Sequence, residues 1–150
     1  MNEIQDEQMR YLNREDLNDL MMFHVKHFRD YKISESSFLS YLDQDQYKVI
    51  AMFHVKHLIG YGIFLECNEE ADLIYIGVIK DFRRSGIGKK LIFTFINENK
   101  IHRLFIEVSV TNAIALKFYI SLGFQILRKR LGYYHGIDAY QMVLNLHSED

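Results

Sequence analysis

The residues that most clearly indicate a chemical function are two glycines, Gly86 and Gly88, which lie within a cluster of basic residues. An apolar run at 73–79 precedes them and an amphipathic run at 87–99 follows, so the pattern predicts a strand that turns into a helix here. The first N–H groups of a helix have no helical acceptor, and together with the helix dipole they attract anions. Because glycine has no side chain, a ligand can approach the backbone closely at both positions. The segment therefore predicts a binding site for a pyrophosphate group.

The spacing of these residues distinguishes between phosphate-binding motifs. The pattern G-x-x-x-x-G-K-[ST] and the three-glycine dinucleotide fingerprint are both missing from the sequence, which disfavours a P-loop NTPase. Arg83, Gly86 and Gly88 instead form the pattern Arg-x-x-Gly-x-Gly. This spacing resembles the acyl-CoA-binding motif of the GCN5-related N-acetyltransferase (GNAT) superfamily. A glycine-containing turn with solvated cations is the alternative interpretation of the same segment.

A second segment carries the same resemblance. Glu107-Val108 lies near the end of a predicted strand, Asn112 opens a predicted helix that contains Tyr119, and Leu122-Gly123-Phe124 follows. This order is similar to the second half of the GNAT core, and its distance from the two glycines also fits. The resemblance covers residues 72–146, and before residue 72 only the pattern of elements fits.

The GNAT resemblance implies an acetyl-CoA-dependent N-acetyltransferase without a metal. The residues that it implies for cofactor binding are Val78, Ile79, Arg83, Arg84, Ser85, Gly86, Ile87, Gly88, Lys89, Asn112 and Tyr119. In this family a bulge separates the strand that contains Gly77 from the next strand, and backbone amides near Val78 and Ile79 face the acetyl group. Gly77 could instead pack beneath a bulky neighbour. Asn112 could also serve as a helix N-cap.

Acetyl transfer requires that the amine lose a proton, that the thioester oxygen be stabilised, and that the departing thiolate be protonated. Glu107 matches a position that several GNAT enzymes use as the general base, and a solvated carboxylate at a strand end is the alternative. Tyr119 matches the tyrosine that acts as the general acid in the family. A phenol with a pKa of about 10 is protonated at neutral pH and can donate to a thiolate. The alternative for Tyr119 is a core aromatic residue.

The acceptor is suggested by Tyr133-Tyr134 and the nearby Asp138-Ala139. This arrangement is similar to protein N-terminal acetyltransferases, including the bacterial type that acetylates the alanine of a ribosomal protein. The resemblance implies that Tyr133 and Tyr134 bind the first residues of a peptide, and the alternative is that the two are loop aromatic residues that close the core. Segment 28–33, however, lacks the Pro and Trp that the ribosomal type usually carries. A small amine (polyamine, amino acid or aminoglycoside) is the alternative acceptor, and a non-catalytic acetyl-CoA-binding module is the alternative function.

The remaining pattern places these residues in one α/β domain spanning 1–150, because no Gly/Ser-rich linker or charge block divides the chain. We expect strands at 11–12, 47–54, 58–66, 71–79, 102–110, 124–131 and 137–146, with residues 132–136 as a loop between the last two. We expect helices that begin near 13–16 and span 34–42, 87–100 and 112–122, with Gly123 as a left-handed C-cap. The resemblance implies a mostly antiparallel sheet with splayed middle strands and flanking helices.

Composition excludes several classes of protein. With 150 residues and 49% hydrophobic content, the chain can bury a sizeable core, and its net charge of -2 provides no general basic field for nucleic acid. Cys67 is the sole cysteine, which favours a reducing compartment. The polar N-terminus is unlike a signal peptide, and no apolar run reaches the ~20 residues of a membrane span. We expect a cytoplasmic monomer or homodimer. The basic cluster 128–130 is interpreted as a solvated strand end, and the alternative is that it reinforces contacts with the cofactor or the substrate.

Four histidines form two His-x-x-His pairs, His24/His27 and His54/His57. They could supply zinc ligands, but residues three apart on a strand point to opposite faces, and we expect no metal site.

The pairs arise because Met22–His27 recurs identically as Met52–His57. One copy falls in a predicted helix and the other at a predicted hairpin, whereas a structural repeat should keep its structure. With the codons ATG TTT CAC GTG AAA CAT, the hexapeptide is encoded by a perfect palindrome that resembles the centromere-like sites of bacterial chromosome-partition proteins. We hypothesise a DNA-level origin, which different codons in either copy would refute.

Overall fold

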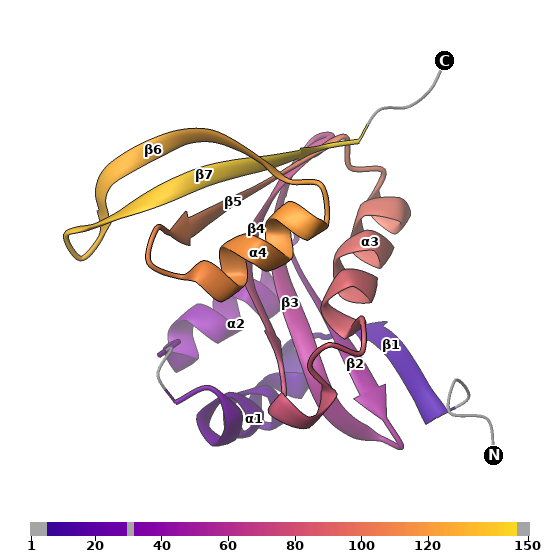
Figure 1. Ribbon diagram of the computed structural model, residues 1–150. Coiled ribbons are helices and arrows are strands. Elements are labelled where there is room, and N and C mark those ends of the chain that lie inside the picture. Colours follow the sequence, from indigo (N-terminus) through magenta and orange to yellow (C-terminus); the bar gives the residue numbers. More distant parts are fainter. Residues whose placement is uncertain (1–5, 30–31, 147–150) are drawn as a thin grey trace.

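The computed structural model describes residues 6–29 and 32–146, which form a seven-stranded sheet with helices on both faces (Figure 1). In chain order the elements are β1 (Glu7–Tyr11), η2 (Arg14–Asp16), α1 (Leu17–His27), α2 (Glu35–Asp43), β2 (Tyr47–His54), β3 (His57–Cys67), β4 (Glu70–Val78), η3 (Lys80–Phe82), α3 (Ile87–Asn99), β5 (Arg103–Ser109), α4 (Ala113–Ser121), β6 (Gln125–Tyr134) and β7 (Ile137–Asn145). The strand order is β1-β2-β3-β4-β5-β7-β6, and each neighbouring pair is antiparallel except β4 and β5. The expected α/β class with a mostly antiparallel sheet is confirmed.

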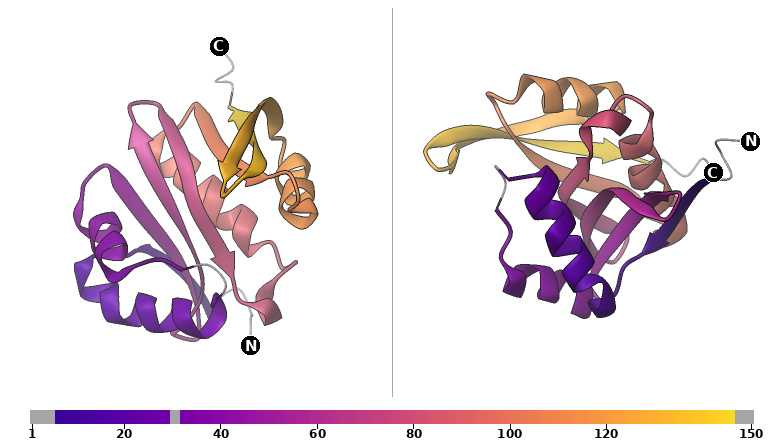
Figure 2. Two further views of the ribbon diagram at one scale, coloured as in Figure 1. Left: turned by 90° about the vertical axis from the view of Figure 1, so that its left-hand side faces the viewer. Right: turned by 90° about the horizontal axis from the view of Figure 1, so that it is seen from below.

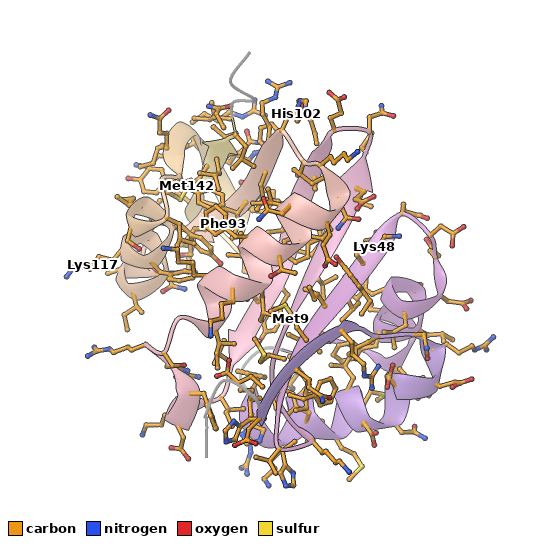
Figure 3. The ribbon with its side chains drawn as sticks, turned by 90° about the vertical axis from the view of Figure 1, so that its right-hand side faces the viewer. Met9, Lys48, Phe93, His102, Lys117 and Met142 are labelled. Carbon is orange, nitrogen blue, oxygen red and sulfur yellow. The ribbon has the colours of Figure 1, made fainter. Side chains whose placement is uncertain are left out.

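Two hydrophobic cores lie on opposite faces of this sheet. Helices α3 and α4 cover one face, and α1 and α2 cover the other (Figures 1 and 2). The predicted apolar stripe of α3 is buried; its members are Ile87, Leu91, Ile92, Phe95 and Ile96. Figure 3 shows Met142 of β7 inside the core beside α4, whereas Lys117 on the outer side of α4 points to solvent. The amphipathic pattern therefore placed α3 correctly.

Strands β4 and β5 are paired over only a short stretch, in which Glu70–Asp72 lies beside Arg103–Phe105. Beyond Asp72, the part of the chain that the structure describes has no further pairing between them, and the two strands diverge (Figure 1). Backbone polar groups on that edge of β4 are not committed to β5 and can bind a ligand. The expected separation of the middle strands is confirmed.

The prediction that Gly77 forms the bulge in β4 is wrong. The irregularity lies at Ile74, which falls out of register with β3, whereas Gly77 pairs in register with Tyr61. A Cβ atom at Gly77 would lie 2.8 Å from Cζ of Phe28 and 2.9 Å from the hydroxyl of Tyr75. Glycine is therefore required because two aromatic side chains cover the strand here, which is the packing alternative.

The expected loop at 132–136 is also largely wrong, because β6 continues to Tyr134 and the connecting turn is His135-Gly136. The register between β6 and β7 shifts between Arg130 and Tyr134, so the predicted substrate tyrosines belong to an irregular strand end. The C-cap prediction holds, since Gly123 has φ 104° and follows α4.

The two copies of the repeated hexapeptide adopt different structures, as expected. Met22–His27 is helical within α1, whereas Met52–His57 spans the end of β2, a turn and the start of β3. In that turn Val55 and Lys56 have φ values of 47° and 68°, as a type I′ hairpin requires. Asn-Gly is the preferred pair there, and a β-branched residue at positive φ is an outlier. Folding alone therefore gives no reason for this dipeptide.

Replacing Val55→Asn and Lys56→Gly together should raise the free energy of unfolding by about 1–2 kcal/mol, because the left-handed conformation is strained for the native pair. The matched control replaces the identical dipeptide in α1, Val25→Asn and Lys26→Gly. Val25 is 66% exposed and Val55 is 55% exposed, so neither change removes a core contact. The control should lower stability by about 1 kcal/mol because glycine is a poor helix former. Urea denaturation measures both, and an unstabilised turn variant would contradict the strain argument.

Candidate active site

The loop before α3 is held in an ordered shape by its own side chains. Arg83 Nε donates to the carbonyl of Val78 at 2.9 Å, and Ser85 Oγ donates to the carbonyl of Phe82. Arg84 and Gly86 both have positive φ, at 67° and 84°. The first bond holds the loop against the end of β4 and the second closes a turn within the loop, so the backbone of the loop is held where the strand diverges from β5.

The start of α3 fits an anionic group such as a pyrophosphate. The first helical bond runs from Lys90 N to Gly86 O, so the amides of residues 87–89 precede it and have no helical acceptor. The first turn contains no acidic residue. A Cβ atom at Gly86 would have no described atom within 4 Å, so this position borders open space. At Gly88 a Cβ would lie 3.1 Å from Phe118 Cζ, so this glycine serves helix packing rather than the close ligand approach that we expected.

Two backbone amides at the end of β4, those of Val78 and Ile79, were predicted to face an acetyl group, and one of them remains a candidate. The amide of Ile79 donates to the carbonyl of Ile59 in β3 at 2.9 Å, so it is already used within the sheet. Successive backbone groups of a strand point in opposite directions. The amide of Val78 therefore points toward the side on which β4 and β5 diverge, and it is the candidate donor.

Glu107 lies in β5 on the face turned away from α3 and α4, because its neighbours Ile106 and Val108 point into that core. The Glu107 side chain is 19% exposed, and its Oε1 lies 3.0 Å from Nε of Arg130. Burial raises the pKa of Glu107, whereas the charges of Arg130 and Arg128 lower it and that of Asp72 raises it. A carboxylate with a raised pKa is a stronger base, so the environment differs from that of a solvated strand end.

Tyr119 lies on the opposite side of the sheet from Glu107. It is 6% exposed within α4, and its ring packs against Phe118 and Phe124, with centroids 5.1 and 5.4 Å away. Tyr119 thus belongs to the core on the face that α3 and α4 cover. The same two helices lie beside the place where β4 and β5 diverge (Figure 1). Asn112 caps α4, since its Oδ1 accepts from Ala115 N at 3.1 Å. The capping role is confirmed.

One of the two expected acceptor residues, Tyr133, lies near Arg130 on the Glu107 side of the sheet. Tyr133 is 48% exposed, and its ring centroid lies 5.5 Å from Cζ of Arg130. Tyr134 ends β6, but its side chain lies outside the described residues. Sequence reasoning missed two aromatic residues, Phe28 and Tyr75, which cover Gly77 on the α1 side. The available signal for Phe28 was its position about one helical turn after His24 in the sequence.

The histidine pairs serve other contacts. Buried His24 has its Nδ1 2.6 Å from the hydroxyl of Tyr61, and His54 pairs with His57 across the β2–β3 turn. Within residues 6–29 and 32–146, no group of three or more His, Cys, Asp or Glu side chains is arranged to hold a metal ion. Among the same residues, no helix is both long and apolar enough to cross a bilayer.

Comparison with known sequences identifies a family model and curated relatives that this chain matches. Residues 3–146 match the family model for an acetyltransferase (GNAT) domain. The chain is 37% identical over 74 residues to the [ribosomal protein bS18]-alanine N-acetyltransferase of Escherichia coli K12. That match covers 47% of this chain and 50% of the relative, so the chain spans about half the length of the curated relatives it matches.

Solved structures align over nearly the whole chain. The ribosomal-protein-S18-alanine N-acetyltransferase from Escherichia coli has a TM-score of 0.84 and 26% identity, and the alignment covers 96% of both chains. Arabidopsis thaliana NAA60, crystallised with acetyl-CoA, has a TM-score of 0.79 and 19% identity over 95% of this chain and 99% of that one. The second likeness is one of fold alone.

Proposed function

Because this chain belongs to the GNAT family of acetyltransferases, we propose that it transfers an acetyl group from acetyl-CoA to the α-amine of a protein or peptide N-terminus. The observation that carries the proposal is the divergence of β4 from β5, with Glu107 on one face and Tyr119 on the other. The anion site at the start of α3 adjoins the same opening. A cofactor bound from the α3 side and an acceptor bound from the α1 side would meet at this gap.

The start of α3 and the end of β4 would hold acetyl-CoA. The amides of residues 87–89, together with Arg84 and Lys89, supply positive potential for the pyrophosphate. Val78 would donate its amide to the acetyl oxygen. When bound, acetyl-CoA supplies an acetyl group activated as a thioester. The protein therefore needs only to position the amine and move protons.

Glu107 and Tyr119 are assigned the two proton transfers. Glu107 accepts a proton from the acceptor amine at a carboxylate oxygen, and its raised pKa suits this task. An α-amine has a pKa of roughly 7.7–8.0, so the base has modest work at neutral pH. Tyr119 holds a proton on its hydroxyl and donates it to the leaving thiolate. Its burial excludes water from that transfer.

A peptide N-terminus suits the acceptor face better than a polyamine. Arg128 and Arg130 project from β6 on the Glu107 side, and these cations repel a polycation. The half-exposed ring of Tyr133 offers apolar contact to a peptide. The bacterial relatives are named for a ribosomal-protein alanine, which supports an N-terminal acceptor and a cytoplasmic site of action. A single catalytic domain over 1–150 is part of the same proposal.

Turnover of acetyl-CoA against N-terminal peptides, spermidine and aminoglycosides tests the acceptor class. Tyr133→Ala should raise KM for a peptide by about tenfold, because one aromatic contact of about 1 kcal/mol or more is lost. Its affinity for acetyl-CoA by calorimetry should not change. The matched variant Tyr133→Phe keeps the ring and should keep most of the affinity.

Each outcome of the panel decides between the alternatives. Acetylation of small amines but no peptide would replace the N-terminal proposal with a small-amine acetyltransferase. Tight binding of acetyl-CoA without turnover of any amine would indicate a non-catalytic module.

A further inference from the structure

We propose that Arg130 is a positioning residue that holds the Glu107 carboxylate and links it to Tyr133 at the acceptor site. This inference rests on the proposed function for the meaning of Glu107 and Tyr133. Arg130 belongs to the basic cluster 128–130, which the sequence indicates is a solvated strand end or a set of cofactor or substrate contacts. In the structure its guanidinium lies close to both a carboxylate and an aromatic ring.

The contact depends on the strand order of the sheet. Strand β7 lies between β5 and β6, so Arg130 must reach across it to Glu107. The β7 residue paired with Arg130 is Ala139, which also pairs with Ser109 of β5. Alanine and serine are small, so the arginine side chain can cross the face of β7. Its Nε then lies 3.0 Å from Oε1 of Glu107, and the Arg130 side chain remains 36% exposed.

The neighbouring cation has a different partner. Arg128 pairs in register with Gln141 and donates from Nε to its Oε1 at 2.7 Å. Gln141 itself pairs with Glu107. Arg128 is thus anchored one strand away, whereas Arg130 makes the ion pair. This difference makes Arg128 a matched control of the same residue type on the same strand.

Arg130 also contacts the aromatic residue assigned to the acceptor. Its Cζ lies 5.5 Å from the ring centroid of Tyr133, which is within the range of a cation–π interaction. The guanidinium is planar and has several donors, so it can stack on a ring while it holds a carboxylate. A peptide that packs against Tyr133 is therefore placed next to the base by the same side chain.

Removing this cation changes the titration of Glu107 in a defined direction. The charged groups that face Glu107 are Arg130 and Arg128 from β6 and Asp72 from β4, and Gln141 of β7 is neutral. Burial and Asp72 raise the pKa of Glu107, and the two arginines lower it. Loss of Arg130 therefore raises the pKa of Glu107 further. More of the base is then protonated at a given pH.

The pH dependence of kcat/KM in Arg130→Met, Arg128→Met and Arg130→Lys tests the proposal. In Arg130→Met the acid limb of the profile should move up by roughly one pH unit, since a cation at this distance has about that effect on a carboxylate. Arg128→Met should move it less. Arg130→Lys keeps the charge but not the planar guanidinium. Its acid limb should therefore lie near the wild-type pH, whereas its maximal kcat/KM should stay below that of the wild type. Thermal unfolding verifies that all three variants fold.

A second readout is independent of catalysis. Carbon NMR titration of the glutamate carboxyls, with Glu107→Gln to assign the resonance, measures the pKa of Glu107 directly. An unchanged Glu107 titration in Arg130→Met would overturn the positioning role. A shifted titration with an unchanged rate profile would support the contact but remove Glu107 as the base, so the two proposals fail separately.

Discussion

Tyr119→Phe is expected to lower kcat by about 10²–10⁴-fold, the usual cost of removing a positioned acid. The change deletes one hydroxyl and keeps the ring, so the packing of Tyr119 against Phe118 and Phe124 should survive. A thiolate that must leave without a proton donor is a poorer leaving group in a site from which water is excluded. Affinity for acetyl-CoA should change little. Steady-state kinetics and calorimetry measure the two quantities separately.

A suitable control for this variant is Tyr11→Phe at the far edge of the sheet. The Tyr11 hydroxyl bonds to Glu98 and Asn99, and burial raises its pKa to about 12. Removing it should cost stability, because its two partners lose a hydrogen bond, but kcat should remain near that of the wild type. A Tyr119→Phe enzyme as fast as the Tyr11→Phe control would make Tyr119 a core residue only.

The second large effect is expected at the anion site. Gly86→Val should weaken acetyl-CoA binding by about 100-fold or more, because the new side chain occupies the open space beside the first amides of α3. Charge-assisted hydrogen bonds are worth about 1.5–3 kcal/mol each, so loss of two is enough for that change. Isothermal titration calorimetry of the purified variant measures the dissociation constant.

Valine at positive φ is also strained, and the chain offers a control for that effect. Gly136 has φ 87°, close to the 84° of Gly86, and a Cβ there also meets no described atom within 4 Å. Gly136→Val should therefore carry a similar conformational cost without loss of acetyl-CoA affinity. Equal affinity in the two folded variants would refute the assignment of the loop as the cofactor site.

Local features were predictable from the sequence because they depend on neighbours along the chain. The burial of the α3 stripe, the cap at Asn112 and the C-cap at Gly123 all agree with prediction. The turn at 55–56 agrees in position as well, although its residues are unusual for the conformation. The end of β6 was missed because Gly132 and the two adjacent tyrosines suggested a loop, whereas the pairing of Tyr134 with Ile137 of β7 extends the strand through them.

The candidate site was only partly predictable. Glu107 and Tyr119 followed from resemblance, and the structure adds that they lie on opposite faces of the sheet at its opening. The sequence alone could not show that the Ile79 amide is already bonded to Ile59, or that Gly88 accommodates Phe118. These facts depend on strand pairing and helix packing between segments that are distant in the sequence, and local periodicity does not predict such contacts.

The sequence by itself determined the strand–loop–helix that we propose as the anion site, since glycine placement, helix polarity and apolar period are local properties. Only the tertiary structure decided which side chains surround Glu107. A shift of one residue in register moves a side chain to the other face of the sheet. Counting residues along the sequence therefore could not predict which face a side chain occupies beyond the bulge at Ile74 or the irregularities of β6. The pairing of Arg130 with Glu107 across β7 is the clearest consequence, because these residues are neighbours through sheet order rather than along the chain.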